Sequence, residues 1–175
     1  YAEKGETWPM VDYKHDKQGT RGYGDYLTAS STIVDEPMTF NGKTWPKNSN
    51  NRYSGPMTMR RGMQTSTNVV AVKLYEQLGS DYSASMVEKY GISTLNKTPN
   101  GDLNPASLAL GGLSKGISPY EMAEAYATFP NGGVRVENRV YTKVVDRDGR
   151  TILSTEKKQH KVLDEGVAYI MVTML

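Results

Sequence analysis

TMRRGMQTSTNVVAVKL, residues 58–74, is the stretch around which the predicted fold is organised. Before the tripeptide Ser66-Thr67-Asn68, Met59 and Met63 are four residues apart. After it the apolar residues keep helical spacing as far as Gly79, which is a helix stop signal. We therefore expect two helices that meet at a small polar junction. A hydroxyl and a carboxamide at such a junction can face one cleft, where they offer a proton carrier and a fixed donor and acceptor pair.

The composition limits the classes of function to consider. The chain has 175 residues, which predicts one domain with a real core, and no run approaches the roughly 18 apolar residues of a membrane span. Its net charge is +2 with both signs spread along the chain, so we expect no nucleic-acid partner. It has no cysteine, and His15 and His160 are isolated among charged residues. We therefore expect no metal and no cofactor.

The first part of the sequence predicts loops and short extended segments. Residues 1–31 are polar and aromatic without a clear period, which indicates a loop-rich insertion. Residues 32–37 predict an extended segment ended by a proline, and Asn41-Gly42 predicts a hairpin turn before a polar loop. Neighbours in an extended segment face opposite sides, so Asp35 and Glu36 are not expected to act as an acid and base pair.

The middle of the sequence, residues 58–130, predicts a helical part. Thr58 is a plausible N-cap for the first helix, and Asp81 is one for a helix over residues 82–90. Residues 107–116 are small and rich in glycine, but they fit neither the dinucleotide-binding spacing nor the P-loop. We expect them to provide close backbone packing beside the cleft.

The clearest local signal is Ser118-Pro119-Tyr120-Glu121, because Ser at the N-cap, Pro at N1 and Glu at N3 make a capping box. Residues 134–155 predict a β-hairpin that turns at 146–149. Residues 164–175 predict the start of a helix that Asp164 caps and that no stop signal ends. The order predicts an α+β fold dominated by helices, and we expect both ends to be internal to a longer protein.

Ser66-Thr67-Asn68 fits one of three motifs that together build one kind of serine acyl-transfer site. Those motifs are Ser-x-x-Lys for the nucleophile and its base, Ser-x-Asn opposite them, and Lys-Thr-Gly on a strand edge. Ser-x-Asn alone is weak, because Ser49-Asn50-Asn51 also matches it, although without flanking helices. Ser154 and Lys157 have the Ser-x-x-Lys spacing but follow a predicted strand, and no Lys-Thr pair is followed by Gly. The residues alone therefore give one motif of three.

Several stretches together resemble the transpeptidase domain of class A penicillin-binding proteins. The resemblance covers about residues 28–175, and it is specific because unrelated blocks recur in the order of the family. The blocks are residues 32–37 with 40–42, 53–60, 66–72, 107–111, 118–123 and 125–133. Residues 1–5 are similar to the end of the nucleophile helix of the family. The resemblance implies the helical part of the β-lactamase and penicillin-binding transpeptidase fold, plus a β-hairpin.

The resemblance implies a D,D-transpeptidase that cross-links peptidoglycan. In the family, a serine attacks the penultimate D-Ala carbonyl of a stem peptide, releases the terminal D-Ala and passes the acyl group to an amine. β-Lactams acylate the same serine. Ser66 would relay protons between the lysine of the first motif and the leaving amine, and Asn68 would hydrogen-bond the substrate amide and help hold that lysine. Thr67 is a weaker candidate for substrate binding. The nucleophile would lie outside this chain, which we therefore expect to be inactive alone.

The resemblance also implies partners and a location. Besides stem peptides and β-lactams, the chain would pair with the remainder of its transpeptidase domain, at the extracytoplasmic face of the bacterial cell membrane. Membrane contact would come only through a segment outside these residues, and a preceding glycosyltransferase domain is left open. Two alternatives stay open: an inactive wall-associated binding or scaffold module of the same ancestry, and an unrelated helical domain with a chance tripeptide. The insertion around residues 8–26 departs from the family pattern.

Overall fold

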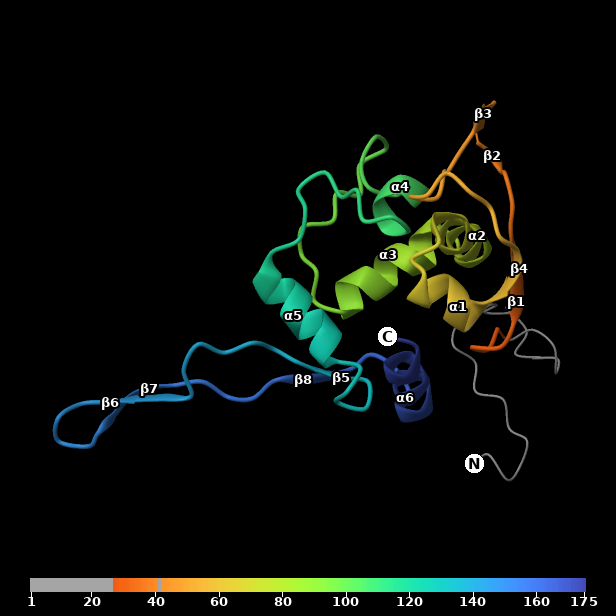
Figure 1. The fold of residues 1–175 in the computed structure, drawn as a ribbon. Coiled ribbons are helices and arrows are strands. Elements are labelled where there is room, and N and C mark those ends of the chain that lie inside the picture. Colours follow the sequence, from red (N-terminus) through yellow and green to blue (C-terminus); the bar gives the residue numbers. More distant parts are fainter. Residues whose placement is uncertain (1–26, 41) are drawn as a thin grey trace, which may run out of the picture.

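The computed structural model describes residues 27–40 and 42–175, which form an α+β fold dominated by helices, as predicted (Figure 1). The helices are α1 (Met59–Gln64), α2 (Asn68–Leu78), α3 (Ser80–Lys89), α4 (Pro105–Leu108), α5 (Pro119–Ala127) and α6 (Glu165–Met174). The strands are β1 (Thr32–Asp35), β2 (Thr39–Phe40), β3 (Lys43–Thr44), β4 (Gly55–Thr58), β5 (Val134–Val136), β6 (Lys143–Val145), β7 (Thr151–Ser154) and β8 (Gln159–Lys161). The predicted insertion lies outside the described residues, except for residues 27–31.

The strands form small antiparallel pairs in place of one large sheet. Within the described residues, the pairs are β1 with β4, β2 with β3, β5 with β8, and β6 with β7. The β1–β4 pair was only half predicted, because the sequence predicts a polar loop up to Pro56 and a helix N-cap at Thr58, with no strand between them. Pairing explains the difference: Ile33 lies opposite Met57, and this non-local partner makes residues 55–58 a strand.

The core at the base of the site joins β1, α1, α2 and α6. Its buried residues are Ile33, Met59, Val70 and Met174. At the contact between α1 and α2, a side chain on Gly62 would begin 2.8 Å from Cγ1 of Val70. The two helices therefore pack closely because Gly62 has no side chain, and this contact fixes the junction between them.

The predicted starts of the helices are mostly correct. Thr58 caps α1, since its side chain accepts a hydrogen bond from the backbone N–H of Arg61. The N-cap predicted at Asp81 is wrong, because α3 begins one residue before it and Gly79 is at the N-cap. A positive φ of 81° at Gly79 lets α2 end and α3 begin at once, so Asp81 falls inside the first turn. There its charge faces the positive end of the helix dipole.

The hairpin predicted over residues 134–155 is confirmed where Val144 and residues 151–153 pair, but it does not extend back to residue 134. β6 and β7 pair as predicted around the turn at 146–149, but β5 pairs with β8 instead. The reason is the anchoring of β5 to α5, where buried Glu124 accepts from Nη1 of Arg135 and from the backbone N–H of Asn138. The strand that leads into α6 then lies alongside β5.

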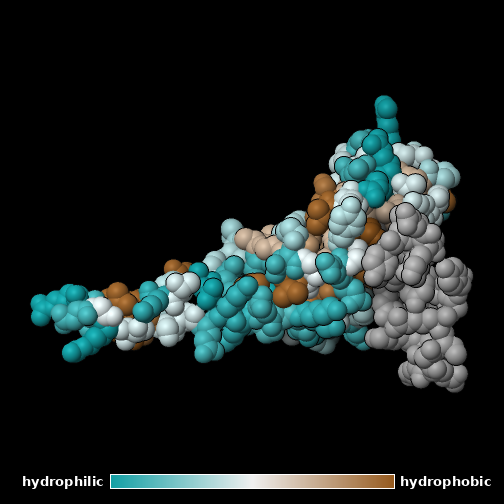
Figure 2. Space-filling view, turned by 90° about the horizontal axis from the view of Figure 1, so that it is seen from below, coloured by the Kyte–Doolittle hydropathy of each residue, from teal (hydrophilic) through white to brown (hydrophobic). Residues whose placement is uncertain are grey.

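The two strand pairs β5–β8 and β6–β7 form an arm that projects from the helical part (Figure 1). Along the arm, apolar side chains lie on the surface, as the space-filling view shows (Figure 2). They include Val140, Val145, Ile152 and Leu153, and Val140 is 85% exposed. The arm therefore contributes little apolar burial to the core.

Two side chains near the start of α6, Asp164 and His160, make contacts that the sequence did not predict. Asp164 is at the N-cap of α6, but its side chain makes no capping hydrogen bond and instead pairs with Lys161 at 2.9 Å. This contact raises the pKa of Lys161. His160 is exposed, as predicted, but its Nε2 lies 2.8 Å from Oε1 of Glu137. Within the described residues, no helix has the length and apolar content needed to cross a bilayer.

Candidate active site

Ser66 lies at a tight reversal between α1 and α2. The backbone N–H of Ser66 donates to the carbonyl of Met63, and that of Thr67 donates to the carbonyl of Gly62. This pair of bonds is the Schellman ending of a helix, which requires a left-handed residue that is usually glycine. Ser66 holds that position with φ at 51° and is exposed. The sequence thus maintains a hydroxyl at a backbone position that other residue types fill more easily.

Thr67 is turned toward the protein. It is buried, and its hydroxyl lies 2.9 Å from the hydroxyl of Thr65 and 3.7 Å from the sulfur of Met57. The hydroxyl of Thr65 donates in turn to the carbonyl of Arg61. These contacts tie the junction to β4 and to the end of α1, so the threonine between Ser66 and Asn68 helps to hold both of them in place.

Asn68 is the first residue of α2, and its side chain is held at one end. Its Nδ2 donates to the carbonyl of Lys47 at 2.8 Å, and the residue is half-buried. No hydrogen bond to its Oδ1 comes from a residue in the part of the chain that the structure describes. The carboxamide is therefore oriented by Lys47 with its oxygen available as an acceptor.

Asn48 and Asp35 are site residues that sequence reasoning missed. Asn48 is buried, and its Nδ2 donates to both carboxylate oxygens of Asp35, at 2.8 and 3.1 Å. Its Oδ1 accepts from the backbone N–H of Val69 at 3.3 Å, which satisfies a free donor at the start of α2. Asp35 also accepts from the backbone N–H of Ser54 at 2.8 Å. The loop between β3 and β4 is thereby clamped against the Ser-x-Asn junction.

Ser66 is at the boundary of two hollows. One has a volume of about 380 Å³ and is lined mostly by polar residues of β1, α1 and the loop between β3 and β4, with Pro56 and Met57 from β4. The other has a volume of about 600 Å³ and is lined mainly by apolar side chains of α1, α2 and α6. Ser66 and Thr67 line both hollows, whereas Asn68 lines only the second. The three predicted site residues are thus brought together at one rim.

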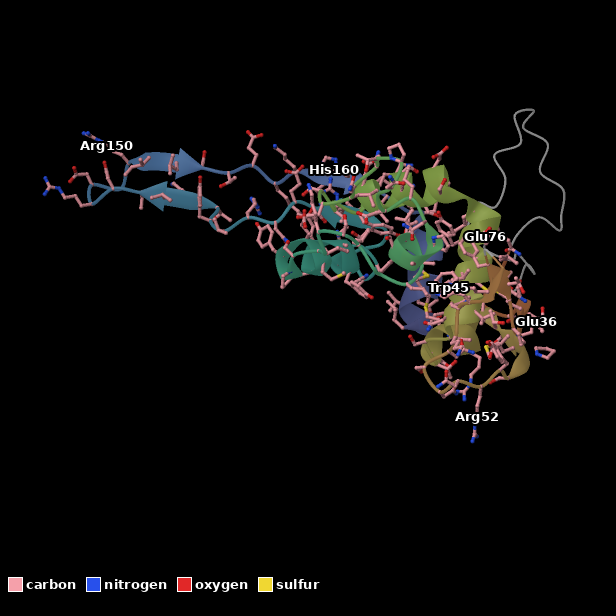
Figure 3. All side chains as sticks on the ribbon, turned by 90° about the horizontal axis from the view of Figure 1, so that it is seen from above. Glu36, Trp45, Arg52, Glu76, Arg150 and His160 are labelled. Carbon is pink, nitrogen blue, oxygen red and sulfur yellow. The ribbon has the colours of Figure 1, made fainter. Side chains whose placement is uncertain are left out.

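The competing motifs lack the helical setting of Ser66. Ser154 ends β7 on the arm, where the chain is exposed, and Arg150 marks the tip of that arm far from α1 and α2 (Figure 3). Ser49 is in the loop that lines the polar hollow, without helices on either side. Among residues 27–40 and 42–175, no group of three or more His, Cys, Asp or Glu side chains is placed to hold a metal ion.

Comparisons with known proteins identify the family of the chain. The family model described as "Penicillin binding protein transpeptidase domain" matches residues 25–175. Penicillin-binding protein 1A of Clostridium novyi is 36% identical over 157 residues, which cover 85% of this chain and 18% of that protein. The protein of the same name from Neisseria meningitidis serogroup A is 33% identical over 156 residues, which cover 83% and 19%. The chain therefore spans about a fifth of the length of these curated relatives.

Solved structures of penicillin-binding proteins share the fold of this chain. Penicillin-binding protein 1A from Haemophilus influenzae superposes with a TM-score of 0.69 at 26% identity, over 85% of this chain and 26% of that one. Penicillin-binding protein A from M. tuberculosis, solved as an imipenem acyl-enzyme complex, gives 0.73 at 19% identity, over 85% and 38%. The second likeness shows the shared fold. With the helix order, the Ser-x-Asn junction and the curated relatives, these matches show that the chain belongs to the transpeptidase family of class A penicillin-binding proteins.

Proposed function

We propose that this chain forms one wall of the active site of a serine-type D,D-transpeptidase, which cross-links peptidoglycan stem peptides and is acylated by β-lactams. The observation that carries the proposal is the placement of Ser66 at the rim of the 600 Å³ hollow, beside a carboxamide that Lys47 orients. A fixed hydroxyl next to an oriented amide is what the second motif of this chemistry requires.

The two side chains have different tasks in this proposal. Ser66 passes a proton between the lysine of the first motif and the leaving amine, because a hydroxyl can donate and accept at once. Asn68 uses its Oδ1 to accept from the substrate amide or from that lysine, while its Nδ2 stays bound to Lys47. The nucleophile and its lysine come from residues other than these 175, and so does the Lys-Thr-Gly strand.

The proposed partners and location follow from the family. The enzyme acts at the extracytoplasmic face of the bacterial cell membrane, where peptidoglycan is assembled. Its membrane contact comes through a segment other than the described helices. Two structures of penicillin-binding protein A from M. tuberculosis are ceftriaxone and imipenem acyl-enzyme complexes, which supports acylation of this enzyme by β-lactams.

Ser66→Ala in the full-length protein tests the proposal. We expect acylation by a fluorescent penicillin and transpeptidation to fall by roughly a hundredfold or more, because general acid–base catalysis contributes about that much. The fold should persist, since the alanine replaces an exposed side chain. Circular dichroism checks this.

The matched control is Ser154→Ala, which removes an exposed hydroxyl on the arm and should leave both rates unchanged. Wild-type acylation rates in Ser66→Ala would remove the proton relay. A full-length protein that binds stem peptides but never becomes acylated would favour the alternative, a scaffold module with an inactive site.

A further inference from the structure

A polar hollow of about 380 Å³ lies beside Ser66, and the proposed proton relay does not use it. Its walls come from four parts of the chain: β1, β4, the loop between β3 and β4, and α1. The lining is mostly hydroxyl, amide and charged groups, in contrast to the apolar hollow on the α6 side. A hollow with this lining suits a polar part of a ligand.

At the back of this hollow, the buried side chains of Asp35 and Asn48 are held by hydrogen bonds within the protein. Asp35 is 1% exposed, and its carboxylate accepts three hydrogen bonds, two from Nδ2 of Asn48 and one from the backbone N–H of Ser54. Asn48 is bound in turn to the carbonyl of Arg52. Because these donors are committed to Asp35, its carboxylate is a structural element of the wall and does not compete for a ligand.

Arg61 supplies a positive charge that has no ion-pair partner within the described residues. It is exposed and lines the hollow together with Thr65, which is one helical turn further along α1 on the same face. No carboxylate among residues 27–40 and 42–175 forms an ion pair with it. Its neighbour Arg60 has a different task, since its guanidinium bonds to the carbonyl and hydroxyl of Thr173 and ties α1 to α6.

We propose that this hollow is a subsite for a side-chain carboxylate of the peptide substrate, and that Arg61 is the residue that binds it. The proposal rests on the proposed function and specifies its substrate. A guanidinium presents paired donors that match a carboxylate, and Ser49 adds a hydroxyl to the same wall.

The position of Arg61 indicates which carboxylate it is. Arg61 lies in α1 and Ser66 in the reversal that follows this helix, and both line the hollow. A peptide that reaches the proposed relay at Ser66 therefore places a neighbouring side chain, and not its reacting carbonyl, in front of Arg61. We assign the carboxylate to that side chain, distinct from the terminal carboxylate.

Kinetics of the full-length enzyme with two donor peptides test the subsite. One peptide carries a free side-chain carboxylate, and the other carries the same group as an amide, with the terminal carboxylate free in both. We expect Arg61→Met to raise KM for the acidic peptide roughly tenfold and to leave kcat unchanged, because a charge-assisted hydrogen bond is lost. KM for the amidated peptide should not change, and Arg61→Lys should restore part of the loss.

Arg150→Met is the matched control, because it removes the same charge at the tip of the arm (Figure 3). It should leave both KM values as in the wild type. An unchanged KM for the acidic peptide in Arg61→Met would overturn the subsite. Equal losses for both peptides would also overturn it, since they would indicate a structural role for Arg61.

Equilibrium binding separates this proposal from the proposed function. Isothermal titration of both peptides into wild-type and Arg61→Met protein needs no turnover. A preference for the acidic peptide that disappears in Arg61→Met supports the subsite even if Ser66→Ala acylates at wild-type rates. Equal binding of both peptides to both proteins overturns the subsite, whatever the outcome at Ser66.

Discussion

The backbone conformation of Ser66 could not be predicted from the sequence. The sequence shows the Ser-x-Asn pattern directly. It does not show that Ser66 has a left-handed conformation, because φ is 51° at a position where glycine is the usual residue. The second copy, Ser49-Asn50-Asn51, has the same letters in a loop without helices. What separates them is the helix ending that presents Ser66 to both hollows, which depends on the packing of Gly62 against Val70.

Asp102 organises the loop between α3 and α5. It is 1% exposed and accepts from the backbone N–H groups of Asn96 and Ser114, at 2.9 and 2.8 Å, and from the hydroxyl of Ser114 at 3.2 Å. These donors stabilise the charged form, the bond from Asn96 most, and lower the pKa of the Asp102 carboxyl below its ordinary value of 3.8. The loop is therefore closed around an ionised carboxylate.

The pH dependence of this loop is the first prediction at the residue scale. A lowered pKa means that the unfolded loop takes up the proton first, so the carboxylate stabilises the loop above about pH 4 and loses this effect as pH falls further. We expect Asp102→Asn to lose hydrogen-exchange protection over residues 92–116 at pH 7 and 5. The ratio of wild-type to variant protection should shrink toward one at pH 3 and below.

The hydrogen-exchange comparison of wild type and Asp102→Asn has two internal controls. Taking the ratio at each pH cancels the intrinsic pH dependence of exchange, and residues 68–78 in α2 serve as the internal reference. A protection ratio that stays constant from pH 7 to pH 3 would contradict the role of the ionised carboxylate.

At the scale of elements, α5 depends on the capping box at its start. The hydroxyl of Ser118 accepts from the backbone N–H of Glu121 at 3.2 Å, and Oε2 of Glu121 reaches back to Ser118. Oε1 of Glu121 also accepts from the hydroxyl and backbone N–H of Ser93, at 2.6 and 3.1 Å, and these contacts lower the pKa of Glu121. The cap therefore joins α5 to the segment that follows α3.

Ser118→Ala is predicted to weaken the first turns of α5. Loss of an N-cap costs about 1 kcal/mol, which corresponds to roughly fivefold faster hydrogen exchange in the helix under native conditions. Exchange measured by mass spectrometry on the full-length protein checks this over residues 119–127. Ser118→Thr keeps the hydroxyl that accepts at the N-cap and donates to Glu121, and it should restore protection. Unchanged exchange in Ser118→Ala would mean that packing alone holds α5.

The difference between predicted and missed elements follows from sequence distance. The caps of α1 and α5 lie within four residues of their partners, so Thr58 and Ser118 were readable from the sequence. The strands β4 and β5 exist because of partners twenty or more residues away, and their own residues show little alternation. Asp164 was misread for a related reason, because Lys161 competes for its carboxylate.

At the scale of the whole molecule, the site is a product of segments that are distant in sequence. Ser66, Thr67 and Asn68 were predicted as a unit, but Asp35 and Asn48 were not. Nothing local marks a carboxylate in a strand and an amide in a loop, 13 residues apart, as partners. They become a buried pair only when β1 and the loop before β4 close over the start of α2, which also creates the polar hollow.

The same arrangement predicts that this 175-residue chain, expressed alone, is not acylated by β-lactams. Acylation needs a serine with an adjacent base, and Ser66 has none supplied by α2. Lys73 is the lysine of that helix, but its Nζ is bound at 2.7 Å to both Glu36 and the carbonyl of Val34. Ser154 and Lys157 have the right spacing, but they lie on the exposed arm.

A fluorescent penicillin incubated with the chain and analysed by denaturing gel and peptide mapping checks this prediction. The full-length protein under the same conditions is the positive control and should be labelled at a serine outside these residues. Covalent label that maps to Ser66 would show that this serine is itself a nucleophile, against the proton relay proposed for it. Label at Ser154 would show that the arm carries a functional Ser-x-x-Lys pair, and the assignment of the active-site wall to the α1–α2 junction would have to change.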